Sequence, residues 1–539
     1  MSDQQLIRGT MILTASIFIS KMLGLIYVFP FKAIVGAEGL ALYQYGYAPY
    51  TLILSLATLG IPLAVSKFVS KYNALGDYRT GQRLFRSGLV VMSITGLIAF
   101  LLLFFLANPI AHRVVDPEQL EGNTIGDVVF TIRMVSVALF VVPIMSLIRG
   151  YFQGFGSMGP TAVSQVIEQI IRIIFILILT FLIIDVWGGG LGTAVGFATF
   201  GAFVGALGGL AVLIVYWKKR NAELNKQVEE STVDHNIPLP KMYKELLKYA
   251  LPISFVGLSI PLYQNVDLLT FNNALDQTGM PQRIAEMYFG VFAQATHKLI
   301  LIPVSIATAM SLTILPTITK SFTNNDTDLL QRQITQTYQI ILFLSVPAAV
   351  GLMLLSDSAY GALFGVGEDF HIGSEMLTYY APVAILFSIF AVTSALLQGI
   401  NRQKYAVIAL LAGILFKLVT NHLFIVTIGP GGAVLSTAIG YGIAIAVNVW
   451  AIGKFADYDY QYLIKRILLI VLFTAVMAGA VVIISLGLQQ WFPLDSRVNA
   501  FVVLGFSVIS GMIVYMYISI RSGLAGQILG HRFKVLQKQ

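Results

Sequence analysis

The chain contains fourteen apolar segments of roughly 20 residues each, the length that a helix needs to cross the hydrocarbon core of a bilayer. Hydrophobic residues occupy 57% of the 539 positions and charged residues only 11%, more apolar surface than a soluble fold could bury. The sequence therefore predicts an all-α polytopic membrane protein. The expected spans are at about 6–30, 39–66, 84–107, 128–148, 160–184, 190–216, 246–270, 285–312, 336–357, 375–398, 405–427, 432–453, 466–488 and 498–520.

The basic residues predict which ends of these spans face the cytoplasm. Lys and Arg gather in three stretches, at 67–86, 218–248 and 454–466, which follow the second, sixth and twelfth spans. By the positive-inside rule this places both termini in the cytoplasm. The same distribution accounts for the net charge of +8 without nucleic acid as a partner. Only five of the 34 basic residues are expected on the outer side, namely Lys32, Arg113, Arg133, Arg283 and Arg497.

A weak internal repeat relates the two halves of the chain. Gln153-Gly154 ends the fourth expected span, and Arg172 follows inside the fifth; a shift of 245 residues gives Gln398-Gly399 and Lys417 in the tenth and eleventh. A shift by an even number of spans keeps orientation, so the sequence predicts two pseudo-symmetric six-helix lobes related by an axis along the membrane normal. The expected parts are an N-lobe at 1–216, a cytoplasmic linker at 217–245, a C-lobe at 246–453, and residues 454–539 with two extra spans and a basic tail.

The sixth expected span carries glycines at a spacing of four residues, Gly201, Gly205 and Gly209. This small-xxx-small pattern lets two helix backbones approach closely in a membrane. A nucleotide-binding loop is disfavoured, because no strand precedes the glycines and the GxGxxG spacing does not occur. We therefore expect this helix to pack tightly against a neighbour.

Several ionisable residues lie inside the expected spans, where a charge is costly unless it faces a cavity or a partner. Glu168 and Arg172 are four residues apart, so a helix would bring them together. A pairing of Asp267 with Lys417 would then leave Lys21 and Lys298 to attract an anion, and phosphate or diphosphate suits such cations. The alternative is that all four cations are structural, paired with carboxylates or snorkelling to an interface. His297, beside Lys298, is expected to be structural or a secondary hydrogen-bond donor.

No enzyme signature occurs in a usable context. The chain has no cysteine, which excludes a thiol nucleophile and a cysteine-ligated metal, and it lacks HExxH, P-loop and GxSxG patterns. The external connections are short for a catalytic domain. We therefore expect a transporter without cofactor or metal, driven by the membrane potential or an ion gradient, and not an enzyme.

Several motifs in order along the chain resemble one known family. They are Arg8-Gly9-Thr10, Ser20-Lys21-Met22-Leu23-Gly24, Gly60-Ile61-Pro62 and Arg149-Gly150-Tyr151-Phe152-Gln153-Gly154. With the fourteen-span layout, these resemble the multidrug/oligosaccharidyl-lipid/polysaccharide exporter superfamily, and within it the polysaccharide-synthesis and MurJ-type lipid II flippases.

The resemblance implies a flippase of the bacterial cell membrane that turns a polyprenyl-diphosphate-linked saccharide from the inner to the outer leaflet by alternating access. Lipid II, the peptidoglycan precursor, is the first expected substrate, and the resemblance leaves room for cell-wall synthesis enzymes as partners. Lys21 stands where the family keeps a basic residue for the diphosphate, and Lys298 and Arg172 are the further candidates. Some relatives bind sodium through acids in the seventh and eleventh spans, but the eleventh here has Lys417 and Asn421. We therefore expect transport to be insensitive to sodium.

Two other functions are kept as alternatives. A drug or cation antiporter of the same superfamily would have an acidic, aromatic cavity, which the surplus of cations disfavours. A polytopic saccharide polymerase or ligase would need catalytic groups in an external connection, where the candidates are Asp116, Glu118, Glu368 and Asp369.

Overall fold

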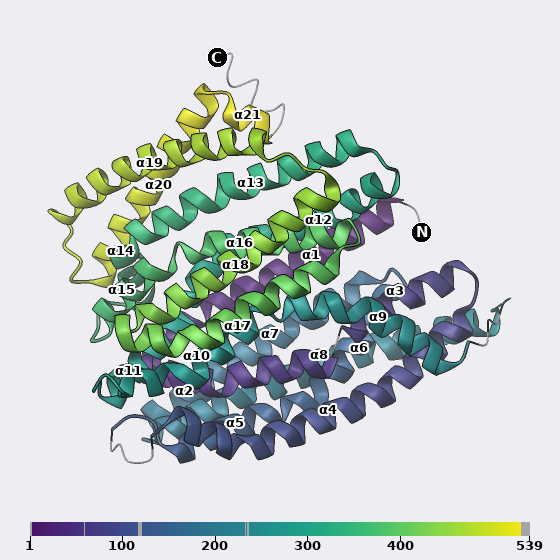
Figure 1. The fold of residues 1–539 in the computed structure, drawn as a ribbon. Coiled ribbons are helices and arrows are strands. Elements are labelled where there is room, and N and C mark those ends of the chain that lie inside the picture. The colour runs from purple at the N-terminus through teal and green to yellow at the C-terminus, as the bar shows by residue number, and fades with distance from the viewer. Residues whose placement is uncertain are drawn as a thin grey trace. The chain divides into compact units, whose positions relative to one another are not determined.

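The computed structural model describes residues 3–529, except 59, 117–120, 232, 234 and 236, and without the side chains of 3–10, 224, 249, 253, 312 and 462. The described chain is helical and has no strand, which confirms the predicted all-α fold (Figure 1). It divides into two compact units, Met1–Leu269 and Thr270–Gln539.

Two glycines interrupt the helical chain near the start of the first unit, one inside α2 and one just before α3. Gly36 has a φ of 69° inside α2, and Gly60 has a φ of 67° just before α3. Such backbone conformations are readily adopted only by glycine, so the chain can bend here. The elements of this unit are α1 (Asp3–Ile26), α2 (Val28–Thr58), α3 (Ile61–Ala74), α4 (Tyr78–Val114), α5 (Ile125–Ser136), α6 (Ala138–Gly154), α7 (Met158–Phe181), the π-helix η1 (Leu182–Val186), α8 (Leu191–Glu229) and α9 (Leu239–Gly257).

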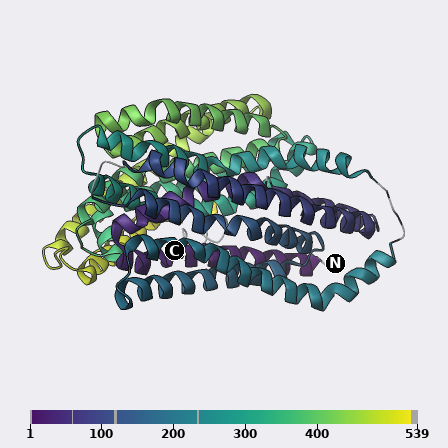
Figure 2. The same ribbon diagram turned by 90° about the horizontal axis from the view of Figure 1, so that it is seen from below.

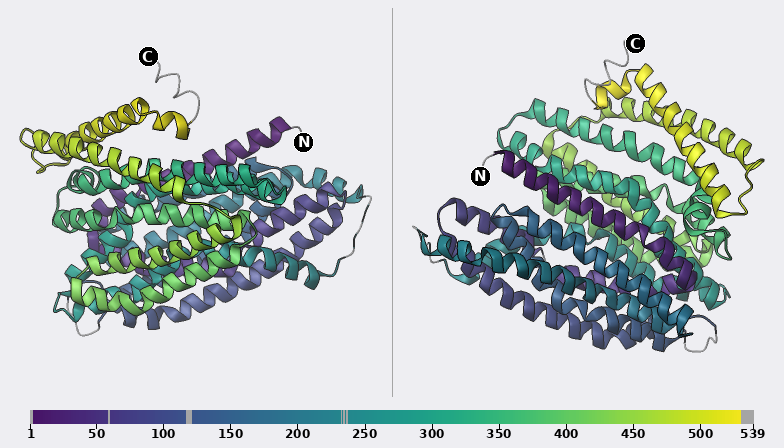
Figure 3. Two further views of the ribbon diagram at one scale, coloured as in Figure 1. Left: turned by 45° about the horizontal axis from the view of Figure 1, so that its top comes forward. Right: turned by 180° about the vertical axis from the view of Figure 1, so that it is seen from behind.

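Helix α10 (Ser259–Asp276) contains the boundary between the units. In the second unit α19 packs along α13, and α20 packs against α19 and α14 (Figure 3). The elements of this unit are α11 (Gln282–Gly290), the π-helix η2 (Val291–Thr296), α12 (His297–Thr323), α13 (Thr327–Leu354), α14 (Ser356–Phe364), α15 (Phe370–Tyr380), α16 (Val383–Gly399), α17 (Gln403–Ile428), α18 (Gly431–Ala456), α19 (Gln461–Gln489), α20 (Arg497–Arg521) and α21 (Leu524–Leu529).

The expected spans fall in the helical parts of the described chain, but several of them, such as 6–30 and 128–148, extend over two helices. Among the described residues, 11 helical segments are long and apolar enough to cross a membrane, and up to 13 if each bent pair is one span. The first of them, Met11–Ala74, has 64 residues, while one crossing takes about 20. Its length accommodates the two spans expected there. The count of fourteen, the orientation of the termini and the lobe boundaries remain predictions.

The internal repeat corresponds to the same helix ending in each unit. After α6, the N–H of Gly156 bonds to Gln153 O (2.8 Å) and that of Ser157 to Phe152 O (3.0 Å). After α16, 245 residues later, Asn401 bonds to Gln398 O (3.1 Å) and Arg402 to Leu397 O (2.7 Å). Both are Schellman endings with a left-handed residue, Gly156 at a φ of 71° and Asn401 at 57°.

The glycine of each Gln-Gly pair is required by close packing. A Cβ at Gly154 would lie 2.9 Å from the carbonyl oxygen of Ser66 on α3, and one at Gly399 would lie 3.0 Å from Cβ of Ile318 on α12. At these glycines the backbones of α6 and α16 therefore each pack directly against another helix of their own unit. The repeat found in the sequence is a repeat of this packing.

The glycines of α8 bring its backbone against α7. A Cβ at Gly201 would lie 2.8 Å from Cγ1 of Ile176, and one at Gly205 would lie 2.8 Å from the carbonyl oxygen of Glu168. A Cβ at Gly209 would lie 2.9 Å from Sδ of Met145 and 3.1 Å from a guanidinium nitrogen of Arg149. The expected close packing of this helix is confirmed, and it occurs beside the charged residues described below.

The connection that follows α8 is shorter than the linker predicted at 217–245. Figure 2 shows α8 as one long helix, which continues to Glu229, and α9 begins at Leu239. The charged stretch from Trp217 was predicted to belong to the linker, but Lys, Arg, Glu and Gln are good helix formers and it continues α8. Lys226 and Glu230 add an i,i+4 pair at 3.7 Å.

This connection is anchored by Asp77, a buried carboxylate in the turn between α3 and α4. One oxygen accepts the N–H of Thr80 (2.9 Å) and caps α4, while the other accepts the backbone N–H of His235 (3.0 Å) and lies 2.7 Å from Nδ1 of that residue. Burial alone would raise the pKa of Asp77, but the hydrogen bonds from Thr80 and His235 outweigh it and hold the pKa below its usual value.

We predict that Asp77→Ala lowers the free energy of unfolding by about 1–2 kcal/mol, because the cap is lost, and that Asp77→Asn, which can still cap α4, costs less. Because the pKa of Asp77 is lower in the folded than in the unfolded state, its ionised carboxylate stabilises the folded protein at neutral pH. This stabilisation is lost as the pH falls through the pKa of the folded state. The advantage of the wild type over Asp77→Asn should therefore vanish in acid. Thermal unfolding in detergent, followed by tryptophan fluorescence at neutral and acidic pH, tests this; equal melting temperatures of wild type and Asp77→Asn at neutral pH would contradict it.

Candidate substrate-binding site

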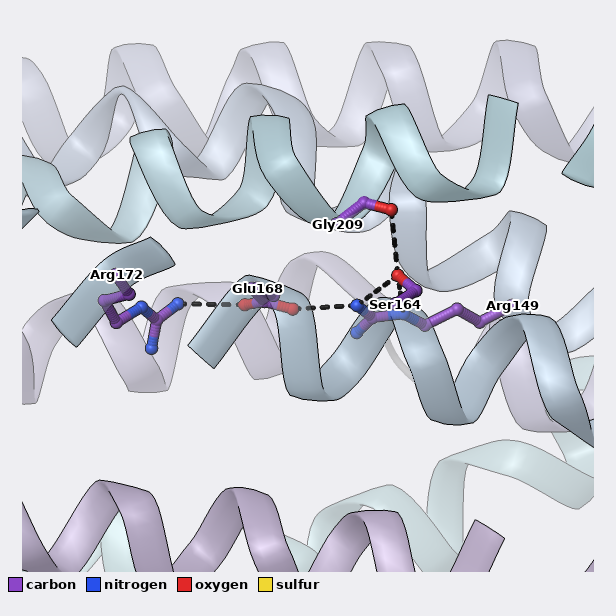
Figure 4. Close-up of polar contacts among 5 residues, drawn as sticks. All are labelled: Arg149, Ser164, Glu168, Arg172 and Gly209. Carbon is purple, nitrogen blue, oxygen red and sulfur yellow. Dashed lines mark hydrogen bonds and ion pairs between the residues drawn. The ribbon is translucent and has the colours of Figure 1, made fainter. Parts of the chain in front are cut away.

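Three charged side chains form a row inside the first unit (Figure 4). Glu168 on α7 lies between Arg149 at the end of α6 and Arg172 one turn further along α7. Its Oε2 is 2.9 Å from Nη2 of Arg149, and its Oε1 is 3.0 Å from Nη2 of Arg172. The side chains are only 12–14% exposed. The second distance is the i,i+4 pair expected from the sequence, whereas the first joins two helices.

Arg149 is held in place by its neighbours. Its Nε and Nη2 donate to Oγ of Ser164 (3.1 and 2.7 Å), and that hydroxyl donates to the carbonyl oxygen of Gly209 on α8 (2.9 Å). Gly209 also leaves room for the guanidinium of Arg149, because it has no side chain. Arg172 also donates from Nη1 to the hydroxyl of Tyr47 on α2 (3.4 Å). The row is thus fixed by four helices, α2, α6, α7 and α8.

A polar pocket of about 280 Å³ opens beside this row. Lys21 of α1, Arg149 of α6 and Glu168 of α7 all line it, together with Ile17, Ser20, Gln165 and Gln169. Helix α1 can approach α7 here because Gly24 has no side chain; a Cβ there would lie 3.1 Å from Nε2 of Gln169. The structure therefore places the predicted Lys21 in one site with the predicted Glu168.

Some polar atoms around the pocket have no hydrogen-bond partner among the described residues. They are the hydroxyl of Ser20, Oε1 of Gln165 and, at the end of the charged row, Nε of Arg172. Buried polar groups are nearly always paired, so unsatisfied ones indicate a ligand or water. Lys21, Arg149 and Arg172 exceed Glu168 by two positive charges. The arrangement is suited to an anion with oxygen acceptors.

Sequence reasoning missed Arg149. The residue lies one position beyond the span expected at 128–148, where an arginine is ordinarily assigned to the membrane interface. The available signal was the motif that begins with Arg149, but no spacing within the sequence connects α6 to Glu168. Close packing of α6, α7 and α8 makes the contact.

The other predicted residues lie elsewhere. Lys298 and His297 are on α12 in the second unit, and His297 is buried with its Nδ1 at 2.9 Å from the hydroxyl of Tyr380. The role of His297 remains a prediction. Asp267 is buried on α10 in the first unit, while Lys417 belongs to the second. The convergence of Lys21 with Lys298, and the pairing of Asp267 with Lys417, remain predictions.

Lys417 is fully buried between α17 and α18. Its ammonium donates to Oδ1 of Asn421 (3.1 Å), to Oγ1 of Thr437 (2.7 Å) and to the carbonyl oxygen of Ala433 (3.3 Å). Asn421 in turn donates from Nδ2 to Oγ1 of Thr270 (2.8 Å). The lysine thus contributes a positive charge to a cluster of oxygen atoms. No group of three or more histidine, aspartate or glutamate side chains that could hold a metal occurs in the described part of the chain.

The second unit also contains an apolar cavity of about 500 Å³ formed by α12, α13, α19 and α20. Its walls are almost entirely aliphatic and aromatic. They include Pro303, Phe343, Pro347, Met477, Val481, Leu504 and Tyr515. The two helices beyond the expected six-plus-six scheme, α19 and α20, therefore supply one side of an apolar space.

The helical bundle with a basic pocket in its interior defines a polytopic membrane transporter. Residues 6–322 match the family described as polysaccharide biosynthesis protein, and the chain belongs to that family. It is 47% identical to lipid II flippase MurJ of Bacillus subtilis (strain 168) over 533 residues, 98% of each protein. The resemblance inferred from the motifs is confirmed.

Solved structures share the fold. An inward closed conformation of lipid II flippase MurJ superposes with a TM-score of 0.68 at 18% identity, covering 96% of this chain and 99% of that one. An inward-facing multidrug resistance MATE family transporter of the MOP superfamily gives a TM-score of 0.65 at 15% identity, covering 83% and 98%. At these identities the likeness shows the fold alone.

We predict that transport by the wild type is the same in sodium and in potassium, because the Lys417 ammonium already supplies the positive charge among these oxygens. Rates measured in vesicles with either cation on both sides test this, and a steep dependence on sodium would contradict it.

Lys417→Met should lower the free energy of unfolding by about 1–3 kcal/mol, because it leaves buried oxygens without a donor.

Proposed function

We propose that the protein is a flippase that moves a polyprenyl-diphosphate-linked saccharide, with lipid II first among the candidates, from the inner to the outer leaflet of the bacterial cell membrane. The observation that carries the proposal is the pocket that Lys21, Arg149 and Glu168 line, with Arg172 paired to the same Glu168. A diphosphate diester has two ionised oxygens, which match the surplus of two positive charges. The near full-length similarity to a protein called lipid II flippase supports the same substrate.

The lipid tail has a different requirement from the diphosphate. A polyprenyl chain gains free energy wherever apolar surface covers it, and the cavity beside α19 and α20 offers such surface. We assign the tail to apolar surface of this kind and the head group to the basic pocket of the first unit. Lys298 of α12 belongs to the same proposal, as a residue that meets the diphosphate later in the cycle.

Transport would proceed by alternating access of the two units, with both termini in the cytoplasm. A substrate drives such a change only as far as it binds the two states differently. Moving net charge across the membrane couples the cycle to the potential by about 2.3 kcal/mol per charge per 100 mV. We propose no cofactor, and an ion gradient or the potential as the energy source.

The alternatives fit the site less well. An antiporter for organic cations needs an acidic pocket, but Glu168, the acid among the described residues that line this pocket, is bound by two arginines. For a polymerase or ligase, Asp369 is buried and accepts a hydrogen bond from Tyr360, as a structural group does. Glu368 pairs with Arg283 at 3.0 Å on the surface, and Glu118 lies outside the described residues.

We predict that Lys21→Ala and Arg149→Ala each lower the rate at which fluorescent lipid II, at subsaturating concentration, moves across vesicles that contain the purified protein by at least tenfold. Each change removes a charge-assisted donor to the diphosphate, which is worth about 1.5–3 kcal/mol, a tenfold to hundredfold loss of affinity. Lys226→Ala, which removes an exposed lysine of α8, is the matched control and should transport normally.

Normal lipid II movement in both variants, with the proteins folded, would refute the assignment of the site. Export of organic cations without any lipid movement would favour the antiporter.

A further inference from the structure

The position of Glu168 raises a question that the binding of an anion does not answer. An anion-binding pocket would attract its ligand more strongly without a carboxylate on its wall, yet Glu168 lines the pocket and occupies both arginines. Each of its oxygens takes one nitrogen from a different guanidinium (Figure 4). The donors that a diphosphate would use are therefore already engaged within the protein.

When the pocket is empty, the carboxylate of Glu168 pairs with two largely buried cations. Arg149 and Arg172 are mostly buried, and a buried charge that loses its partner is strongly unfavourable. Glu168 supplies that partner to both arginines at once. When an anion enters, the same carboxylate competes with it for Nη2 of each arginine and repels its charge.

We propose that Glu168 is an internal counter-anion that takes the place of the substrate's diphosphate on Arg149 and Arg172 when the site is empty, and so sets how readily the substrate is released. This inference rests on the proposed function and extends it from binding to release. Glu168 is in this account a positioning residue, because it acts on the substrate through the two arginines. The carboxylate lowers the affinity for the substrate and in return speeds its departure.

The contacts around the two arginines would allow a phosphate group to replace Glu168. Ser164 and the α8 backbone hold Arg149 in place, and Tyr47 contacts Arg172, so both guanidinium groups stay in position when Glu168 releases them. Nε of Arg172 remains without a partner among the described residues, which leaves it a second donor for an incoming oxygen. A guanidinium can then bind a phosphate group through two parallel hydrogen bonds.

The test uses the isosteric variant Glu168→Gln, which removes the charge and keeps the shape. Binding of inorganic pyrophosphate to the purified, full-length protein is measured by calorimetry, and movement of fluorescent lipid II is measured in vesicles. We expect Glu168→Gln to bind pyrophosphate at least tenfold more tightly, and to show a lower KM together with a lower kcat. Glu168→Asp, which keeps the charge, should restore part of the wild-type behaviour, and Glu230→Gln, a surface change of the same kind, should have no effect.

Unchanged or weaker binding of pyrophosphate by folded Glu168→Gln would overturn the proposal. Where that variant is too unstable to study, Arg172→Gln is compared with the double variant Arg172→Gln/Glu168→Gln, which carries the same surplus of charge as the wild type. The double variant should bind pyrophosphate more tightly than Arg172→Gln alone, and equal affinities would contradict the competition.

The two proposals fail in different ways. If the wild type binds pyrophosphate but moves no lipid II, the proposed function is wrong while the competition is still measured by calorimetry. If lipid II moves but Glu168→Gln leaves both pyrophosphate affinity and KM unchanged, only the role of Glu168 is wrong.

Discussion

Inside a bilayer, a charged side chain must be matched by another charge or by a polar cavity, and this constraint explains the charged row of the first unit and the pocket beside it. Two arginines share one glutamate, and the excess positive charge lies at a pocket that Lys21 lines. In the second unit Lys417, at the position that repeats Arg172, is surrounded by oxygen atoms of Asn421, Thr437 and Ala433. The free-energy cost of burying a cation is thus offset by a carboxylate at Arg172 and by neutral oxygen atoms at the equivalent Lys417.

Close approach of helix backbones makes the charged row possible. Gly205 and Gly209 bring α8 against α7, and the carbonyl oxygen exposed by this approach fixes Ser164, which fixes Arg149. A larger residue at Gly209 would contact the guanidinium of Arg149. The glycines that allow α7 and α8 to pack closely therefore also determine the position of the Arg149 guanidinium.

The sequence was sufficient for those features that depend on local spacing. Apolar length predicted the helices, the i,i+4 rule predicted the Glu168–Arg172 pair, and the 245-residue shift predicted a repeat that proved to be a helix ending. It was insufficient where contacts join different helices. Arg149 was missed because its partner lies 19 residues away on another helix, and the charged stretch after Trp217, predicted to belong to the linker, is helical to Glu229.

The central claim is that the diphosphate binds between Lys21 and Arg149 and displaces Glu168. The most direct measurement is an electron cryomicroscopy structure of the protein with lipid II bound. We predict that the diphosphate lies within hydrogen-bonding distance of Lys21 and Arg149, and that Glu168 has separated from at least one of its arginines. A diphosphate located away from these residues, or one located there with both Glu168 ion pairs intact, would contradict the account.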